Sequence, residues 1–231
     1  MKPTISSSRG IIKWGVGLTI IGLAALAVIY VLALVYTPLE VRQGAAQKIF
    51  YVHVPAAWSA MMAFSLVGLV SILYLWLRDE RLDAFAAASA EVGLVFSVIM
   101  LTTGPIWGKP IWGTWWTWDA RLTLTLILFL LFLGYMTLRS AIHDPAERAR
   151  FSAVVGIMGM VLVPFIHLSV YLFRTLHPKP IVLKASAPSL PPEMLRTLLL
   201  GFLAATVLYL GFVVLRYGLA RHAMAELDEE N

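Results

Sequence analysis

Two histidines and a dense group of tryptophans are the residues of this 231-residue chain whose types could do chemistry. His53 lies in the sequence YVHVPAAW, and His177 lies in RTLHP. Between them, residues 107–123 read WGKPIWGTWWTWDARLT, with five tryptophans in twelve residues. Neutral imidazole is a metal ligand, indoles pack on flat apolar surfaces, and Lys or Arg side chains pair with carboxylates. Together these groups suit a flat, metal-containing ligand with acidic substituents.

Heme meets each of these demands. Two imidazoles can bind its iron axially, indoles can pack against the porphyrin, and cations can pair with the two propionates. The chain contains no cysteine, which excludes disulfides, thiolate metal ligands and covalent heme attachment through CXXCH. A porphyrin would therefore be held without covalent bonds. The alternative is that the tryptophans only anchor a loop at a membrane surface, where indole rings gather.

The composition indicates an integral membrane protein. Hydrophobic residues make up 60% of the chain and charged residues 13%, and the mean hydropathy is +0.82. The net charge of +5 could suggest nucleic acid, but the basic residues are scattered among the connecting segments and form no stripe. We therefore expect membrane lipid around the chain and no nucleic-acid partner.

Six apolar runs are long enough to cross a bilayer. We expect residues 1–231 to form a single all-α domain, a bundle of six transmembrane helices with a Trp-rich interfacial loop on its outer face. No small-residue cleavage site follows the first run, so that run is expected to be a retained helix. The third run is the shortest and contains Glu91. The expected spans are about 15–36, 58–77, 85–101, 122–138, 152–173 and 195–215.

The Trp-rich segment is expected to leave the helical path, because helix breakers interrupt it. These breakers are Gly104, Pro105, Gly108, Pro110 and Gly113. The segment would then be a loop or a short helix at the membrane surface.

Six spans place both termini on one side and the first, third and fifth connections on the other. His53, the Trp-rich segment and His177 then share one face, whichever way the chain is inserted. Ten basic residues on the terminal side against eight on the other slightly favour cytoplasmic termini. The ten are Lys2, Arg9, Lys13, Arg78, Arg81, Arg139, Arg148, Arg150, Arg216 and Arg221, and the eight are Arg42, Lys48, Lys109, Arg121, Arg174, Lys179, Lys184 and Arg196.

Three motifs together resemble the heme exporter protein C (CcmC) family of the bacterial cytochrome c maturation system. They are WGTWWTWDARLT, YVHVPAAW and PFIHLSVYLFRTLHP, and they span most of the chain. The Trp-rich motif is also typical of a wider superfamily of heme-handling membrane proteins. His177-Pro178 is a small departure from some relatives and leaves the histidine in place.

The resemblance implies a bacterial inner-membrane protein that binds heme b non-covalently at the periplasmic face. It implies delivery of this heme to the periplasmic chaperone CcmE, in a complex with the ATPase CcmA, the membrane subunit CcmB and the small protein CcmD. Carried over by motif, His53 and His177 are the expected axial ligands. The expected heme-binding residues are His53, Trp107, Trp112, Trp115, Trp116, Trp118, Asp119, Arg121 and His177. No catalytic residues are expected.

Several of these residues have competing interpretations. His167 is a rival ligand, or a neutral residue facing the bundle interior. Asp119 could orient a heme-contacting group or contact the chaperone, and it could equally cap the fourth helix. Arg121 could pair with a propionate or extend to the interface. Weaker propionate candidates are Arg42, Lys48, Lys109 and Arg174.

Other residues are expected to lie away from the heme. Glu91 is expected at the terminal end, interfacial or hydrogen-bonded, and His143 and His222 are expected to be ordinary solvated residues on the terminal side. At the level of the whole protein, the alternatives are a membrane b-type cytochrome, a heme lyase of the same superfamily and a scaffold without heme.

Overall fold

A computed structural model describes residues 4–182 and 184–230, and within these ranges the chain folds into six long helices. Each of the six is long and apolar enough to cross a membrane, so the prediction of an all-α, six-span membrane protein is confirmed. Lys2, counted above for the terminal side, lies outside the described residues. The helices are α1 (Ile5–Val35), α2 (Phe50–Leu77), α3 (Glu80–Trp112), α4 (Ala120–Ala141), α5 (Pro145–Leu172) and α6 (Pro192–Glu230), and a short 3-10 helix, η1 (Ala45–Ile49), leads into α2.

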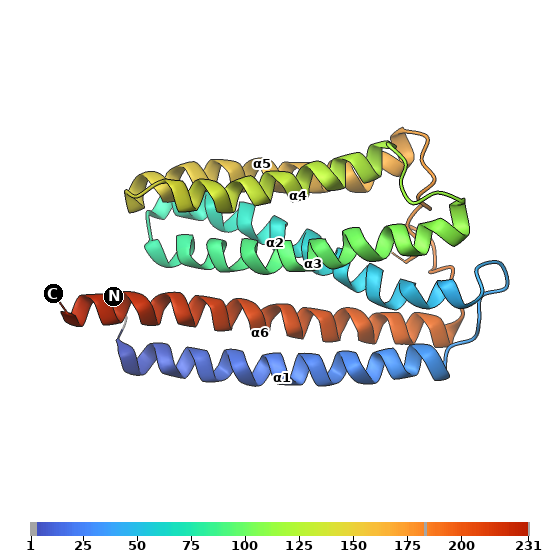
Figure 1. Ribbon diagram of the computed structural model, residues 1–231, viewed down its shortest axis with the longest axis horizontal. Coiled ribbons are helices and arrows are strands. Elements are labelled where there is room, and N and C mark those ends of the chain that lie inside the picture. The colour runs from blue at the N-terminus through green and yellow to red at the C-terminus, as the bar shows by residue number, and fades with distance from the viewer. Residues whose placement is uncertain (1–3, 183, 231) are drawn as a thin grey trace.

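The helices form three stacked pairs, α4 with α5, α2 with α3, and α1 with α6 (Figure 1). α1 packs almost entirely against α6. Glycines make this contact close: a Cβ atom on Gly22 would lie 2.6 Å from Leu208 Cα, and one on Gly211 would lie 2.5 Å from the Thr19 nitrogen. Small residues at helix contacts let two backbones approach, as is common in membrane proteins.

The middle pair holds the bundle together. Phe64 of α2 stacks on Phe132 of α4 with ring centroids 3.9 Å apart. Towards the terminal end, the guanidinium of Arg139 donates two hydrogen bonds to Asp83, at 2.6 and 2.8 Å, and its charge lies 5.6 Å from the centre of the Tyr135 ring. This paired, largely buried charge fixes α4 against α3.

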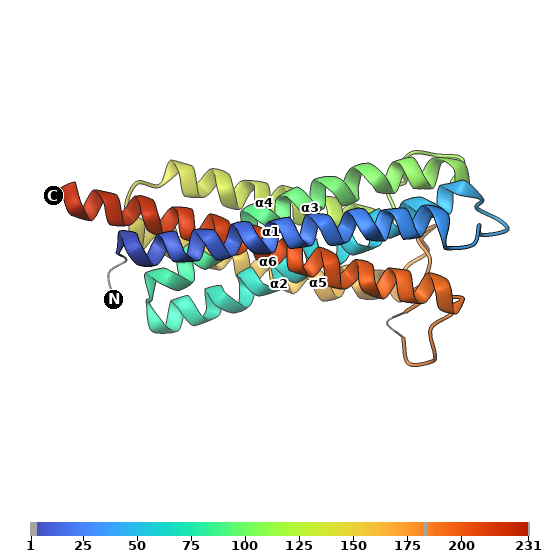
Figure 2. The ribbon, with the colours of Figure 1, turned by 90° about the horizontal axis from the view of Figure 1, so that it is seen from below.

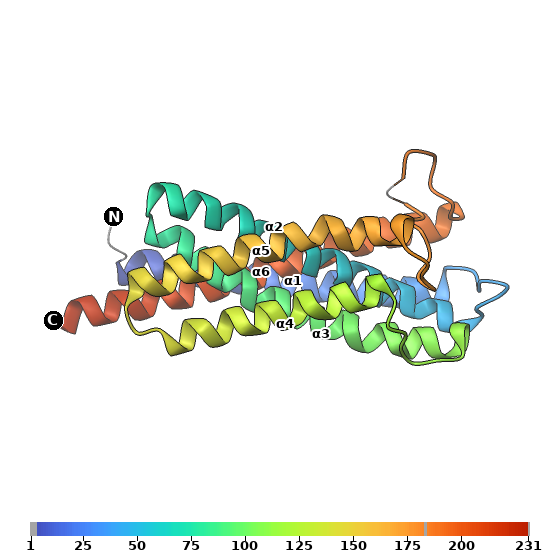
Figure 3. The ribbon, with the colours of Figure 1, turned by 90° about the horizontal axis from the view of Figure 1, so that it is seen from above.

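The start of α1 and the end of α6 lie at one end of the bundle, and the first, third and fifth connections lie at the other (Figures 1, 2 and 3). These connections are residues 36–49, 113–119 and 173–191. The prediction from parity is therefore confirmed. We call this end of the molecule the loop end, and the opposite one the terminal end.

Two predicted helix boundaries were wrong, and both concern the site. α2 begins at Phe50, so His53 lies on a helix and not in the preceding connection. α3 has 33 residues and is not the shortest span, because it continues through Pro105 and Pro110 as far as Trp112. Membrane helices tolerate Pro and Gly because neighbouring helices and side chains satisfy the freed backbone groups. The helix stops instead at Gly113, whose φ of +75° forms a left-handed C-cap.

Candidate functional site

His53 lies near the start of α2, with its ring against α3. Its centroid is 5.8 Å from that of Trp107, edge to face, and a Cβ atom on Gly104 would lie 3.1 Å from His53 Cε1. His53 Nδ1 is 3.1 Å from Thr103 Oγ1, and the Thr103 hydroxyl donates its own proton to the Ile99 carbonyl at 2.6 Å. Thr103 must therefore accept from His53 Nδ1–H, and the carbonyl of Met100 is a second acceptor for the ring. The lone pair of His53 is left on Nε2.

His177 lies in the connection between α5 and α6. Like His53 it carries its proton on Nδ1, but its acceptor is a backbone carbonyl. Its Nδ1 is 2.9 Å from the carbonyl of Pro178, which can only accept, so Nδ1 carries the proton. Withdrawal of the ring from water, followed by the charge of Arg121, lowers the pKa of His177 to about 3. The ring is thus neutral at physiological pH with its lone pair on Nε2, the form that binds a metal.

The two imidazoles and Arg121 form one electrostatic group. Arg121, in the first turn of α4, reaches towards α5 and lies 3.4 Å from the Ile166 carbonyl. Its charge acts on both imidazoles, and His53 is itself among the causes that lower the pKa of His177. The loop end therefore brings together a helix residue and a loop residue that are 124 positions apart (177 − 53).

Asp119 connects the Trp-rich loop to the segment that carries His177. Its Oδ1 accepts from the Leu122 N–H at 3.0 Å, which caps α4, and its Oδ2 accepts from the Thr175 hydroxyl at 2.7 Å. Thr175 Oγ1 in turn accepts from the His177 N–H at 3.0 Å. Asp119 therefore caps α4, as its sequence context allowed, and its hydrogen bond to Thr175 also connects it to the backbone of His177.

The tryptophans divide into two groups. Trp107 and Trp112 lie on α3, not in the loop as predicted, and Trp107 Nε1 donates to Gln43 Oε1 at 3.0 Å. Trp115, Trp116 and Trp118 lie in the loop, with 57% of Trp115 and 77% of Trp118 exposed. Only the first group includes a ring against a candidate ligand in the part of the chain that the structure describes. Trp115 and Trp118 present their indoles at the surface of the loop end.

Two of the weaker propionate candidates are already engaged with backbone. Lys48 Nζ donates to the carbonyl and the hydroxyl of Thr37, both at 2.6 Å, and so closes the end of α1. Lys109 Nζ donates to the Gly113 carbonyl at 2.9 Å and closes the end of α3. Both are helix-capping cations. Arg42 and Arg174 are exposed at the loop end.

Three histidines lie away from this group. His167 is exposed on α5, 6.5 Å from the Tyr171 ring between centroids, so the expectation that it faces the bundle interior was wrong. His222 is not simply solvated, because its Nδ1 is 2.8 Å from Ser8 Oγ and its Nε2 is 3.4 Å from Glu226. His143 is exposed as predicted.

Glu91 agrees with the sequence-based expectation. Arg216 Nε donates to Glu91 Oε2 at 2.9 Å, and both side chains are partly exposed. The acid therefore links α3 to α6, away from the loop end.

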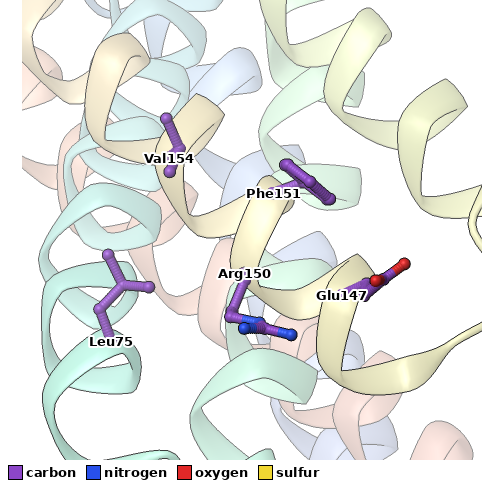
Figure 4. A pocket seen from close by; sticks show the side chains of 5 residues that line it. All are labelled: Leu75, Glu147, Arg150, Phe151 and Val154. Carbon is purple, nitrogen blue, oxygen red and sulfur yellow. The ribbon is translucent and has the colours of Figure 1, made fainter.

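A surface hollow of about 380 Å³ lies at the terminal end, between α2 and α5 (Figure 4). Leu75, Glu147, Arg150, Phe151 and Val154 line it. These side chains offer no imidazole for iron. Within residues 4–182 and 184–230, no group of three His, Cys, Asp or Glu residues could hold a metal ion. A metal ion at the loop end would thus have the two imidazoles as its candidate protein ligands. Its remaining ligands would have to come from a macrocycle that binds together with it.

Residues 4–227 match the family model described as CcmC, heme exporter protein C. The chain belongs to the heme exporter protein C family. Curated relatives named heme exporter protein C are 41% identical over 172 residues in Bradyrhizobium diazoefficiens, 37% over 195 in Haemophilus influenzae and 35% over 186 in Escherichia coli K12. These alignments cover 74%, 84% and 80% of this chain, and 65%, 79% and 76% of the relatives. The chain thus spans slightly less than two thirds of the first relative.

Residues that sequence reasoning missed in this heme exporter protein C family member are small and polar. Thr103, Gly104 and Thr175 touch a candidate ligand or its backbone. Thr103 and Gly104 adjoin the third apolar run, where a threonine or glycine has an ordinary packing role. The spacing that would have identified them is helical: residues 103, 104 and 107 lie on one face of a helix that was expected to have ended.

Proposed function

We propose that this protein binds heme b non-covalently at the loop end, with His53 and His177 as the two axial ligands, and delivers it for cytochrome c maturation. The observation that carries the proposal is that both imidazoles lie at the loop end, within electrostatic range of Arg121. Both rings hold the proton on Nδ1 and the lone pair on Nε2. Bis-imidazole ligation of heme iron requires this form of the ring.

The remaining residues of the loop end suit the rest of a porphyrin. Trp107, packed against His53, offers an apolar wall. Trp116 Nε1 is buried without a hydrogen-bond partner among the described residues and could donate to a carboxylate. Arg121 and Arg174 are the cations that we assign to the propionates, since Lys48 and Lys109 are occupied. Asp119 is assigned a positioning role, because its carboxylate already accepts several hydrogen bonds.

The relatives' name supports a transfer subunit and not an enzyme. We propose that residues 1–231 act as one domain in the bacterial inner membrane, with cytoplasmic termini and a periplasmic loop end. Exposed Trp115 and Trp118 would face the chaperone CcmE, and covalent attachment of heme would take place on CcmE. ATP hydrolysis is assigned to CcmA, with CcmB and CcmD completing the complex.

The direct test is a heme titration of the purified protein in detergent. We expect one heme per chain and a low-spin, six-coordinate absorption spectrum, because two imidazoles saturate the axial positions. His167→Ala is the matched control, since His167 is exposed on α5, and its spectrum and affinity should equal those of the unmodified protein. A protein that binds no heme, or in which His167→Ala loses a ligand, would contradict the proposal.

The absence of cysteine permits an equally direct test of orientation. Ser186→Cys places a thiol in the exposed connection between α5 and α6, and His143→Cys places one in the connection between α4 and α5. In spheroplasts, a membrane-impermeant maleimide should label Ser186→Cys and should label His143→Cys only after lysis. The cysteine-free chain is the blank. The reverse pattern would place the heme site in the cytoplasm.

A further inference from the structure

We propose that Thr103 is a positioning residue for heme ligation, whose hydroxyl oxygen holds the Nδ1–H of His53 and thereby aims Nε2 at the iron. The inference rests on the function proposed above, because it assumes that His53 is a ligand. It assigns the orientation of that ligand to one side chain of the neighbouring helix. No sequence motif marks this residue.

The direction of the hydrogen bond follows from the partners of Thr103. Its hydroxyl has one proton, and the Ile99 carbonyl at 2.6 Å takes it. The oxygen that remains, 3.1 Å from His53 Nδ1, can only accept. The bond to the Ile99 carbonyl therefore fixes the direction of the hydroxyl, and its oxygen lone pairs are left to accept from His53.

The surroundings of the ring place Thr103 where it can help to fix the orientation of the imidazole. Gly104 has no side chain, so His53 Cε1 can approach α3 closely, and Trp107 borders the ring one helical turn further on. Thr103, Gly104 and Trp107 therefore form a three-residue seat for the imidazole. Within this seat only Thr103 contributes a side-chain acceptor to Nδ1.

The two candidate ligands differ in the type of group that accepts a hydrogen bond from Nδ1–H. His177 donates to the Pro178 backbone carbonyl, an acceptor that no side-chain substitution removes. His53 donates to a side chain as well as to the Met100 backbone carbonyl, so part of its support can be removed without touching the ring. A hydrogen bond to Nδ1–H raises the basicity of Nε2 and strengthens the bond to iron. The gain is larger for ferric than for ferrous iron, because ferric iron is the more strongly Lewis-acidic state.

The test replaces Thr103 with valine, which has the same shape and no hydroxyl, and with serine, which keeps the hydroxyl. We expect Thr103→Val to weaken ferric heme binding about tenfold, the lower end of the range for outer-shell partners, because the Met100 carbonyl remains near the ring. If ferrous binding is unchanged, a tenfold loss raises the midpoint potential by about 59 mV for one electron. Thr103→Ser should match the unmodified protein in affinity and potential.

Thr102→Val is the matched control. Thr102 is the preceding residue of α3, and its hydroxyl also bonds carbonyls of its own helix, those of Val98 and Ile99, but it is exposed and contacts no histidine. Elution from a sizing column in detergent checks that each variant is folded. An unchanged potential and affinity in Thr103→Val, or equal shifts in Thr103→Val and Thr102→Val, would overturn the inference. A failure of heme binding in the unmodified protein would instead contradict the proposed function.

Discussion

Alanine in place of His177 or His53 is expected to remove one axial ligand and to turn a low-spin, six-coordinate heme into a high-spin, five-coordinate one. Loss of an outer-shell partner alone costs 10–100-fold in metal affinity, so loss of the ligand itself should cost more than about 100-fold. His167 and Lys48 are poorly placed to substitute for either ring, because His167 is exposed on α5 and Lys48 is bonded to Thr37. Absorption and electron paramagnetic resonance spectra of the reconstituted variants measure the change.

Chemical rescue separates loss of a ligand from collapse of the site. In His177→Gly, imidazole added to the buffer should restore the six-coordinate spectrum, because His177 lies in a connection and is only partly buried. His143→Ala, at the terminal end, should leave the spectrum unchanged. A six-coordinate spectrum that survives in His177→Ala without imidazole would identify a different axial ligand.

The position of both imidazoles at the loop end could be predicted from the sequence, and the surroundings of each ring could not. Hydropathy predicts six spans, and an even number of spans places the connections with His53 and His177 at one end whatever the packing. This prediction rests on the number of spans alone and uses no information about which residues contact one another. For the same reason it could not distinguish Thr103, which touches a ligand, from Thr102, which does not.

The errors at α2 and α3 share one physical cause. Sequence reasoning treated Gly104 and Pro105 as the end of one helix and placed YVHVP before the start of another, as would be expected in water. In a membrane bundle the neighbouring helices satisfy the freed backbone groups, so both helices extend towards the loop end. This extension carries His53 and Trp107 on rigid elements. Gly113 was the true signal for the end of α3, because it is the one helix breaker of this segment with a positive φ, which glycine adopts without strain.

The second large effect concerns Asp119. Asp119→Asn is expected to lower heme affinity about tenfold while costing less stability than loss of the helix cap. Asparagine caps helices as well as aspartate, so the Leu122 hydrogen bond survives. The amide group that replaces Oδ2 cannot accept from the Thr175 hydroxyl, so the segment with His177 loses its anchor. Heme titration and thermal unfolding measure the two quantities separately.

The charge of Asp119 should matter as well as its geometry. Burial alone would raise the pKa of Asp119, but hydrogen bonds from the Leu122 N–H and from the Thr175 and Thr117 hydroxyls outweigh it, so that pKa is lowered. The carboxylate is therefore ionised at neutral pH. Its contribution to stability is present above the pKa of the unfolded chain and is lost as the pH falls through the lowered folded value.

Asp144→Ala provides the matched control, because Asp144 caps α5 at the terminal end by accepting from the Glu147 N–H at 2.7 Å. Loss of this cap should destabilise the fold by about 1 kcal/mol without changing heme affinity. Asp119→Ala should show both effects, the lost cap and the weakened binding. If Asp119→Asn binds heme as tightly as the unmodified protein, Asp119 only caps α4, and the connection that carries His177 is held by other contacts.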